Sequence, residues 1–336
     1  MNHVPSIDVI YTHTEGEPTC IVHSGIQYPP GSDIHAKRSF LQEHHDNLRK
    51  GLMREPRGHH HMFGVFVTPP SGPDTDAGML WMDGERFVEM CGHGTIALGM
   101  AMVSQGLLPR TGDETEIRFE TPVGVVRATV ESEGDQVRAT RFTNVPAFVL
   151  EQDVELDVPE VGRLYADIVF GGNFFAIVKW PSDVRPINAD NGSYFADMGL
   201  RIREMVREKV KIRHPEYPEM SELHFVTFWH EPSRKDSFYR NVHVFSDGKL
   251  DRSPGGTGTS AMMAMFRKRG QLEVGQIIRS EGLLGSGQFE GWIDRETSVG
   301  DLTAVIPNVR GTASLTGYAK WLFSPEDALT EGFVIR

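Results

Sequence analysis

The 336-residue chain has the length and composition of two ordinary globular domains, with 39% hydrophobic and 24% charged residues. Its formal net charge of -12 argues against binding to nucleic acid or to an anionic membrane surface, and no run of about 18 apolar residues predicts a membrane span. The N-terminus lacks the pattern of a secretion signal and the chain has only two cysteines, so we expect a cytoplasmic protein without disulfides.

Short β-like runs dominate the chain and predict an α+β fold rather than a doubly wound sheet. These runs are rich in Val, Ile, Phe and Thr, and they cover 4–11, 62–68, 79–82, 116–120, 123–130, 137–142, 165–170, 174–178, 225–229, 242–245 and 303–307. Amphipathic helices are expected at about 32–52 and 194–213. Two further helices, 95–106 and 259–270, are almost wholly apolar for two turns and end in Gly, which predicts that they are buried.

The two apolar helices belong to an internal repeat. Residues 83–97 reappear as 247–261, at the constant offset of 164 residues that separates Cys91 from Gly255. Each copy places a glycine-rich loop before its helix, but only the first copy carries a thiol there. Half of the chain therefore looks like a duplicate of the other half.

The repeat predicts two pseudo-symmetric lobes, each with strands wrapped around its apolar helix. The N-terminal lobe is expected to span 1–155 and the C-terminal lobe 156–310, with the boundary in the polar stretch 151–160. We expect the tail, 311–336, to return to the N-terminal lobe.

Cys91 is a candidate base because it stands at the first turn of a predicted buried helix. Unpaired backbone N–H groups and the positive end of the helix dipole stabilise a thiolate at such a position. Gly92 and Gly94 allow a ligand to approach the backbone, and Gly256–Gly258 provides a second socket for a small anion. Two such sockets suggest a substrate whose carboxylate is held while the adjacent carbon loses a proton. The alternative is that Cys91 is only a small buried hydrophobic residue.

These residues resemble the proline racemase superfamily, which includes proline racemases, 4-hydroxyproline 2-epimerases and trans-3-hydroxyproline dehydratases. Met90–Thr95 and Asp251–Ala261 resemble its two active-site motifs, and further similar segments follow in the family's order at 13–19, 55–59, 62–64, 171–174, 241 and 306–307. The resemblance implies a fold like diaminopimelate epimerase, with a curved, mostly antiparallel sheet around a central helix in each lobe. It also implies an imino-acid substrate of the proline or hydroxyproline type in the cleft between the lobes, and no cofactor or metal. A homodimer is left open.

The resemblance assigns roles to individual residues. Cys91 would be the catalytic base, and Asp251 would bind the secondary ammonium of the substrate. The backbone N–H groups of Gly92, His93, Gly256 and Thr257 would clamp the carboxylate. The side chain of His93 would either reach a ring hydroxyl or fix its loop. From its position, Thr259 is expected to cap its helix.

Gly255 departs from the racemase pattern, in which a second cysteine protonates the opposite face of the α-carbon. The dehydratases of the family keep the first cysteine and have threonine at the second position. One base is enough for dehydration, so the sequence favours dehydration of a trans-3-hydroxyproline. The alternatives are an epimerase or racemase with a substitute for the second thiol, and a non-catalytic imino-acid-binding protein. We also expect that Gly255→Cys would create inversion.

Three other features are given structural explanations. The triplet 59–61 contains three histidines, but neighbouring residues of a strand-like segment point to opposite faces, which argues against a metal site. Residues 92–97 and 256–261 match the dinucleotide pattern GxGxxA, although Pro254 precedes the second match where a strand should lead into the loop. Cys20 is expected to contribute to packing rather than to catalysis.

Overall fold

The computed structural model describes residues 6–335, which divide into two compact units. One unit consists of 6–142 with 312–335, and the other is Thr143–Gly311. The predicted boundary at 155 falls inside strand β9 (Ala147–Val158), so it lies too far along the chain. The charged residues from Glu151 to Asp157 are the exposed positions of that strand and not a linker, and they alternate with more buried ones.

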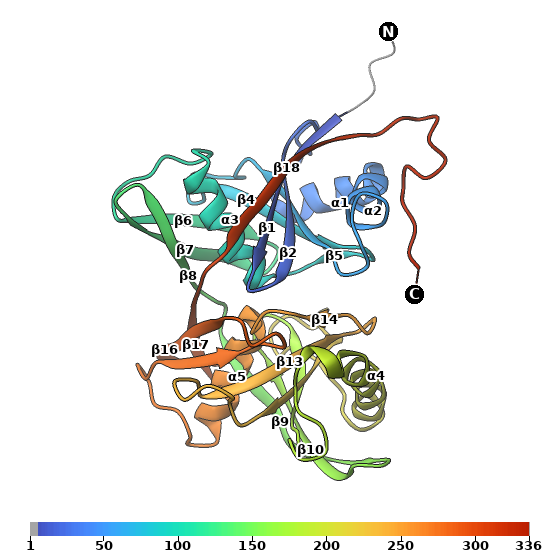
Figure 1. Ribbon diagram of the computed structural model, residues 1–336. Helices are drawn as coiled ribbons and strands as arrows, with labels where there is room; N and C mark the ends of the chain where they lie inside the picture. Colours follow the sequence, from blue (N-terminus) through green and yellow to red (C-terminus); the bar gives the residue numbers. More distant parts are fainter. Residues whose placement is uncertain (1–5, 336) are drawn as a thin grey trace. The chain divides into compact units, whose positions relative to one another are not determined.

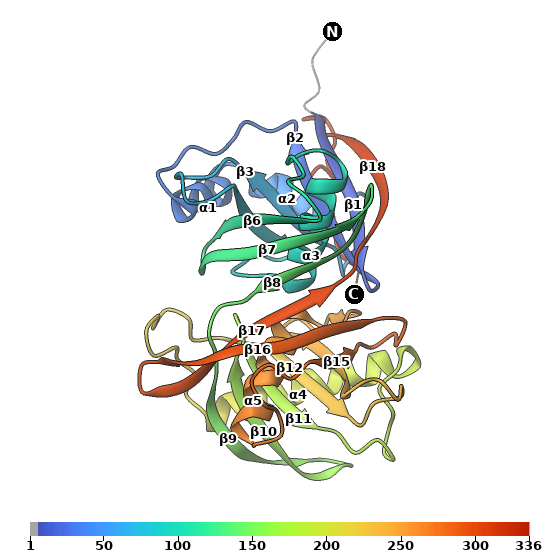
Figure 2. The same ribbon diagram turned by 90° about the vertical axis from the view of Figure 1, so that its left-hand side faces the viewer.

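The first unit is a mostly antiparallel sheet in the order β18-β1-β2-β3-β4-β6-β7, with β5 paired to β4 (Figures 1 and 2). Only the β2–β3 and β4–β6 pairs are parallel. Its strands are β1 (Ser6–Thr14), β2 (Glu17–Ser24), β3 (Phe63–Thr68), β4 (Ala77–Asp83), β5 (Phe87–Val88), β6 (Glu114–Thr121), β7 (Gly124–Glu133), β8 (Gln136–Thr143) and β18 (Ser314–Leu322). Its helices are α1 (Ile34–His44), α2 (Asp46–Met53) and α3 (Gly92–Ser104).

Helix α3 is the buried centre of this unit. It contacts β1, β2, β3 and β7, which lie far apart along the sheet, so the sheet curves around it (Figure 2). Every residue from Gly92 to Val103 is buried, as expected for a helix that is apolar on all sides. Helices α1 and α2 pack against β4 instead. The prediction of a single helix at 32–52 is wrong, because the backbone of His45 leaves the helical region and separates α1 from α2.

The second unit is a sheet that closes on itself. Its strands follow the order β9-β10-β11-β12-β13-β15-β16-β17, and β17 pairs again with β9 through Ala304 and Val305. Only β11–β12 and β13–β15 are parallel, so the two units share one pattern of pairing, as a duplication requires. Besides β9, the elements are β10 (Gly162–Phe170), β11 (Phe174–Lys179), β12 (Leu223–His230), β13 (Tyr239–Phe245), β14 (Leu250–Asp251), β15 (Ile278–Glu281), β16 (Gln288–Val299), β17 (Leu302–Gly311), the short η1 (Ala189–Asn191), α4 (Gly192–Lys209) and α5 (Gly256–Lys268).

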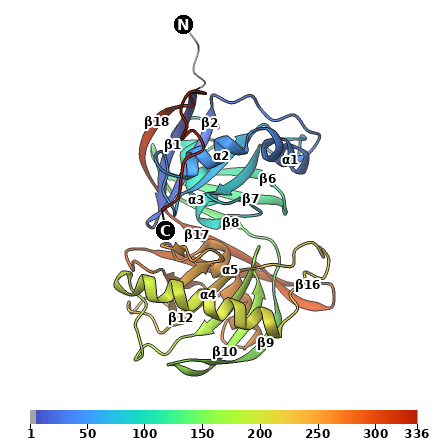
Figure 3. The same cartoon turned by 90° about the vertical axis from the view of Figure 1, so that its right-hand side faces the viewer.

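Helix α5 runs inside this closed sheet and α4 lies outside it (Figure 3). Helix α5 contacts β9, β10, β11, β16 and β17, and its residues from Gly256 to Phe266 are buried. Helix α4 packs on β9, β12 and β13 through a stripe of apolar side chains at helical spacing: Phe195, Met198, Ile202 and Val206. No helix within 6–335 has the length and apolar character of a membrane span.

Both central helices begin three residues earlier than the sequence predicted, at Gly92 and Gly256 rather than at Thr95 and Thr259. The glycine-rich segments are therefore the first helical turns themselves and not loops that precede them. The first N–H groups of a helix have no partners within the helix, so these segments present backbone donors at the start of α3 and of α5.

Candidate active site

Cys91 is the residue immediately before α3, in an extended conformation with φ -135° and ψ 110°. Its carbonyl accepts hydrogen bonds from the backbone N–H and the hydroxyl of Thr95, at 3.0 and 2.7 Å. Cys91 is buried, with 5% of its surface exposed. It stands at the N-terminal end of α3, where the helix dipole is positive. This is the environment in which a thiolate is stabilised.

His93 lies directly beside this thiol. Both ring nitrogens are 3.5 Å from Sγ of Cys91, and the ring packs edge-on against Phe63 at 5.2 Å between centroids. The backbone carbonyl of His93 accepts a hydrogen bond from the hydroxyl of Thr14, 2.9 Å away, which fixes this turn to β1. Two roles were expected for the imidazole, reaching a ring hydroxyl of the substrate or fixing its loop, and these contacts decide between neither; they place the ring against the thiol.

Gly94 is required by packing. A Cβ built on it would lie 2.4 Å from the ring of Trp81 and 3.0 Å from Sγ of Cys91. The indole therefore occupies the space beside the first turn of α3, and any larger residue would displace the ring or the thiol.

The second glycine segment is preceded by a buried carboxylate. Asp251, at the end of β14, is 6% exposed, and its Oδ1 accepts hydrogen bonds from the N–H and the hydroxyl of Ser253 at 2.8 and 2.7 Å. The same hydroxyl accepts a hydrogen bond from the N–H of Gly255 at 3.1 Å. Burial raises the pKa of Asp251 to about 6, against an ordinary value of 3.8, so ionising this carboxyl is costly until a cation pairs with it. The equivalent position of the first copy is Phe87, so only the second copy has this carboxylate.

Gly255 immediately precedes α5 and has a positive φ of 77°, a conformation that other residues adopt only with strain. A Cβ built there would lie 2.2 Å from Nε2 of His243. The expectation that Gly255→Cys would add a working thiol is therefore wrong for the chain as it stands, because the imidazole of His243 already fills the space that the new side chain would need.

Gly256 and Thr257 occupy the first turn of α5, where their N–H groups have no acceptor within the helix. Thr259 is the fourth residue of the helix and not its cap. Its N–H bonds to the carbonyl of Gly255 at 2.8 Å, and its hydroxyl reaches Oγ of Ser280 at 3.1 Å. The prediction that Thr259 caps the helix is wrong, because the helix begins earlier than expected.

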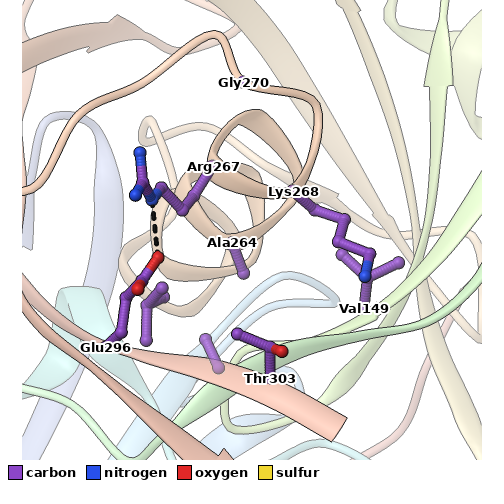
Figure 4. Close-up of a pocket in the computed structure, with 9 residues that line it drawn as sticks. Val149, Ala264, Arg267, Lys268, Gly270, Glu296 and Thr303 are labelled. Atoms are coloured by element: carbon purple, nitrogen blue, oxygen red, sulfur yellow. Dashed lines mark hydrogen bonds and ion pairs between the residues drawn. The ribbon is translucent and has the colours of Figure 1, made fainter.

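A surface pocket of about 360 Å³ lies at the opposite end of α5 (Figure 4). It is lined by Ala264, Arg267 and Lys268 of the last turns, and Glu296 holds Arg267 through an ion pair at 2.8 Å. Eleven residues of helix separate Gly256 from Arg267, or roughly 16 Å at 1.5 Å per residue, so this pocket is distinct from the glycine segment.

Cys20 and the histidines 59–61, the other residues considered from the sequence, lie in the core and in a turn. Cys20, on β2, is completely buried in the core of the first unit, and burial raises the pKa of its thiol to about 12. The histidines 59–61 form a turn before β3 rather than a strand. Within 6–335, no three or more His, Cys, Asp or Glu side chains are grouped so that they could hold a metal ion.

The chain matches the proline racemase family over residues 9–334 and belongs to that family. It is 55% identical to a 4-hydroxyproline 2-epimerase of Cereibacter sphaeroides over 98% of both chains, and 36% identical to a trans-3-hydroxy-L-proline dehydratase of Azospirillum brasilense, also over 98% of both chains. Among solved structures, a hydroxyproline epimerase from Agrobacterium vitis with bound trans-4-hydroxy-L-proline is similar, with a TM-score of 0.90 and 26% identity over 100% of this chain and 97% of that one.

These relationships correct the preference for a dehydratase. That preference rested on one position, because Gly255 leaves Cys91 as the single thiol of the two motifs and dehydration needs only one base. The relative with 55% identity carries the name of an isomerase, however, and the dehydratase is 36% identical. Identity over nearly the full chain reflects the whole site and its surroundings, whereas Gly255 is one position of that site.

Sequence reasoning missed His243, the side chain that faces Gly255. The signal was present in β13, where Tyr239, Asn241, His243 and Phe245 alternate and therefore share one face of the strand. Only the side-chain contacts show that this face is turned toward α5: Tyr239 bonds to Thr259, and Asn241 and His243 bond to the carbonyl of Pro254.

Proposed function

We propose that this protein is a 4-hydroxyproline 2-epimerase that works without a cofactor. Its reaction would invert C2 of trans-4-hydroxy-L-proline to give cis-4-hydroxy-D-proline, and the reverse. The observation that carries the proposal is the 55% identity, over 98% of both chains, to a protein of that name. A related epimerase crystallised with trans-4-hydroxy-L-proline supports the same substrate class.

Cys91 would act as the base on one face of C2. Its position before α3 and the contact with His93 support this role, because both favour the thiolate. As the thiolate takes the α-proton, negative charge moves into the carboxylate. The N–H groups of Gly92 and His93, in the first turn of α3, would donate to that carboxylate and stabilise the charge.

The second copy of the repeat would contribute further contacts to the substrate. Asp251 would pair with the secondary ammonium, and the N–H groups of Gly256 and Thr257 would donate to the carboxylate. The raised pKa of Asp251 supports this role, since a buried carboxylate without a cationic partner is unfavourable and gains most from binding one.

The test is the incubation of the purified protein with trans-4-hydroxy-L-proline, followed by chiral chromatography for cis-4-hydroxy-D-proline. Parallel reactions contain L-proline and trans-3-hydroxy-L-proline. We expect inversion of the 4-hydroxy substrate with the highest kcat/KM. Inversion of proline alone would assign a racemase instead, and binding of 4-hydroxyproline by calorimetry without any turnover would contradict an enzymatic role.

A further inference from the structure

Two side chains of β13 hold the carbonyl of Pro254, the residue before the turn at Gly255. Nδ2 of Asn241 donates to this carbonyl at 3.1 Å, and Nε2 of His243 lies 3.0 Å from it. A carbonyl oxygen can only accept, so the ring of His243 carries its proton on Nε2. The N–H of Gly255, on the other side of the same peptide, donates to Oγ of Ser253 at 3.1 Å. Side chains therefore fix both polar atoms of the peptide that joins Pro254 to Gly255.

His243 is a fixed hydrogen-bonding group in this arrangement. The hydroxyl of Thr227, on β12, lies 2.7 Å from Nδ1, so both ring nitrogens are in use. Burial lowers the pKa of the ring to about 4 from an ordinary value of 6.5, so the ring is neutral near pH 7. A Cβ added to Gly255 or to Gly258 would collide with the imidazole. The ring therefore lies directly against the start of α5, and only glycines at these two positions leave room for it.

Asn241 keeps its donor toward the turn at a cost. The residue is completely buried, and its Oδ1 has no hydrogen-bond partner within residues 6–335. Turning the amide over would place Oδ1 against the carbonyl of Pro254, where two acceptors would face one another. A buried acceptor without a partner is unfavourable, and an apolar side chain of similar size would avoid that loss. The amide at this position therefore serves as a donor.

The first copy of the repeat is built differently at the equivalent place. Gly94 and Gly258 are related by the offset of 164 residues. A Cβ on Gly94 would meet the six-membered ring of Trp81, whereas one on Gly258 would meet the imidazole of His243. The residue that immediately precedes the helix has a φ of -135° in the first copy and of 77° in the second. The left-handed turn and the polar side chains behind it thus occur together in the second copy.

We propose that Asn241 and His243 are positioning residues for the anion-binding turn of α5. This inference rests on the proposed epimerase function, in which the first two N–H groups of α5 donate to the carboxylate of the substrate. With the carbonyl of Pro254 fixed, Gly255 keeps its left-handed conformation and those two N–H groups keep their direction. Both side chains act through the backbone, and neither reacts with the substrate. They hold the donors in place before the carboxylate arrives.

The first experiment compares two substitutions of His243 that differ in a donor. The amide of glutamine can still donate to the carbonyl of Pro254, whereas leucine cannot. We expect His243→Leu to lower kcat/KM for 4-hydroxyproline at least roughly tenfold, mainly through KM, because the carboxylate is already present in the bound substrate. His243→Gln should stay within a few-fold of the unmodified protein. His230→Leu is the control, since His230 is also buried but bonds to the backbone of Ile187 and Glu231, and it should change kcat/KM little.

A second readout asks whether the loss concerns the carboxylate. The prolinamide of trans-4-hydroxy-L-proline keeps the ring and the secondary ammonium but replaces the carboxylate with a neutral amide. Calorimetry gives the dissociation constant of the acid, and competition gives that of the amide. The unmodified protein should prefer the acid, and His243→Leu should reduce this preference roughly tenfold. A general loss of packing would instead weaken both ligands equally.

Asn241→Leu separates positioning from stability. Leucine has a similar size and leaves no buried acceptor without a partner, so the melting temperature should not fall. KM should still rise roughly tenfold, and the preference for the acid over the amide should fall with it, because one donor to the carbonyl of Pro254 is lost. A lower melting temperature with an unchanged KM would show that Asn241 only supports the fold.

The outcomes are distinct. Unchanged KM and an unchanged preference for the acid in both leucine variants would overturn the positioning role while leaving the epimerase intact. If His243→Leu does not fold, as judged by circular dichroism, Asn241→Leu carries the same test. Failure of both variants to fold would assign the two side chains to the fold and would also overturn the proposal. Failure of the unmodified protein to bind or invert any proline derivative would instead refute the proposed function.

Discussion

Asp251→Asn should stabilise the free protein while it weakens binding of the substrate. Burial raises the pKa of Asp251 to about 6 from an ordinary value of 3.8. At 1.36 kcal/mol per pH unit, this difference corresponds to about 3 kcal/mol that the folded protein loses when the carboxyl ionises. Asparagine keeps an oxygen that can accept from Ser253 but carries no charge, so it avoids that loss.

The sign of the pH dependence follows from linkage. A raised carboxyl pKa means that the folded chain binds the proton more tightly than the unfolded chain does. The stability associated with the protonated form is therefore complete below pH 4 and is lost as the pH rises through 6. Asparagine does not titrate, so the free energy of unfolding of the variant should rise relative to that of the wild type as the pH increases. Roughly 1.5 kcal/mol of the 3 kcal/mol difference should develop between pH 5 and pH 8.

Urea denaturation at several pH values measures this difference, because other titrating groups cancel between two proteins that differ at one position. Asp301→Asn, at an exposed residue in the turn after β16, provides the surface control. In the turnover assay Asp251→Asn should raise KM roughly 10- to 150-fold, since a charge-assisted hydrogen bond contributes about 1.5–3 kcal/mol. A stability difference that is flat or falls with pH, or an unchanged KM, would refute the argument.

Three further predictions concern the first unit. Cys91→Ser should reduce inversion at least roughly 100-fold with little change in melting temperature, because an alkoxide forms far less readily than a thiolate; near wild-type rates would exclude Cys91 as the base. Iodoacetamide should modify Cys91 before Cys20, which is fully buried, as peptide mass spectrometry can show, and the reverse order would contradict the site. Gly94→Ala should cost about 1–3 kcal/mol in unfolding experiments because its Cβ meets Trp81 at 2.4 Å, whereas Gly72→Ala, with open space around it, should be neutral; equal effects would argue against this packing.

The repeat and the two central helices could be predicted because their signals are local. An apolar run without a polar face identifies α3 and α5 wherever they pack, and Cys91, Asp251 and the glycines lie within a few residues of those helices. The starts of the helices were misplaced because glycine has low helical propensity, which the packing of both first turns overrides.

The domain boundary and the position of His243 beside Gly255 depend on contacts between distant residues. In the sequence, the charges of Glu151–Asp157 resemble those of a linker. Only the pairing of β10 with β9 shows that these residues belong to a strand whose alternate positions are more buried. His243 meets Thr227 through the pairing of β12 with β13, and it meets Gly255 through a turn whose backbone conformation no short pattern specifies. The preference for dehydration failed because it rested on the single position Gly255, whereas the 55% identity to a 4-hydroxyproline 2-epimerase extends over 98% of both chains.

The geometry around Gly255 makes two residues depend on each other. His243 donates to the carbonyl of Pro254, and with the peptide in that orientation Gly255 adopts a φ of 77°, which an L-residue could share only at a cost of roughly 1–2 kcal/mol. The ring also occupies the volume of the missing side chain, so a thiol at 255 and an imidazole at 243 exclude one another. Replacing either residue alone leaves a cavity or a collision. A thiol at position 255 therefore fits only if residue 243, on the strand behind it, changes as well.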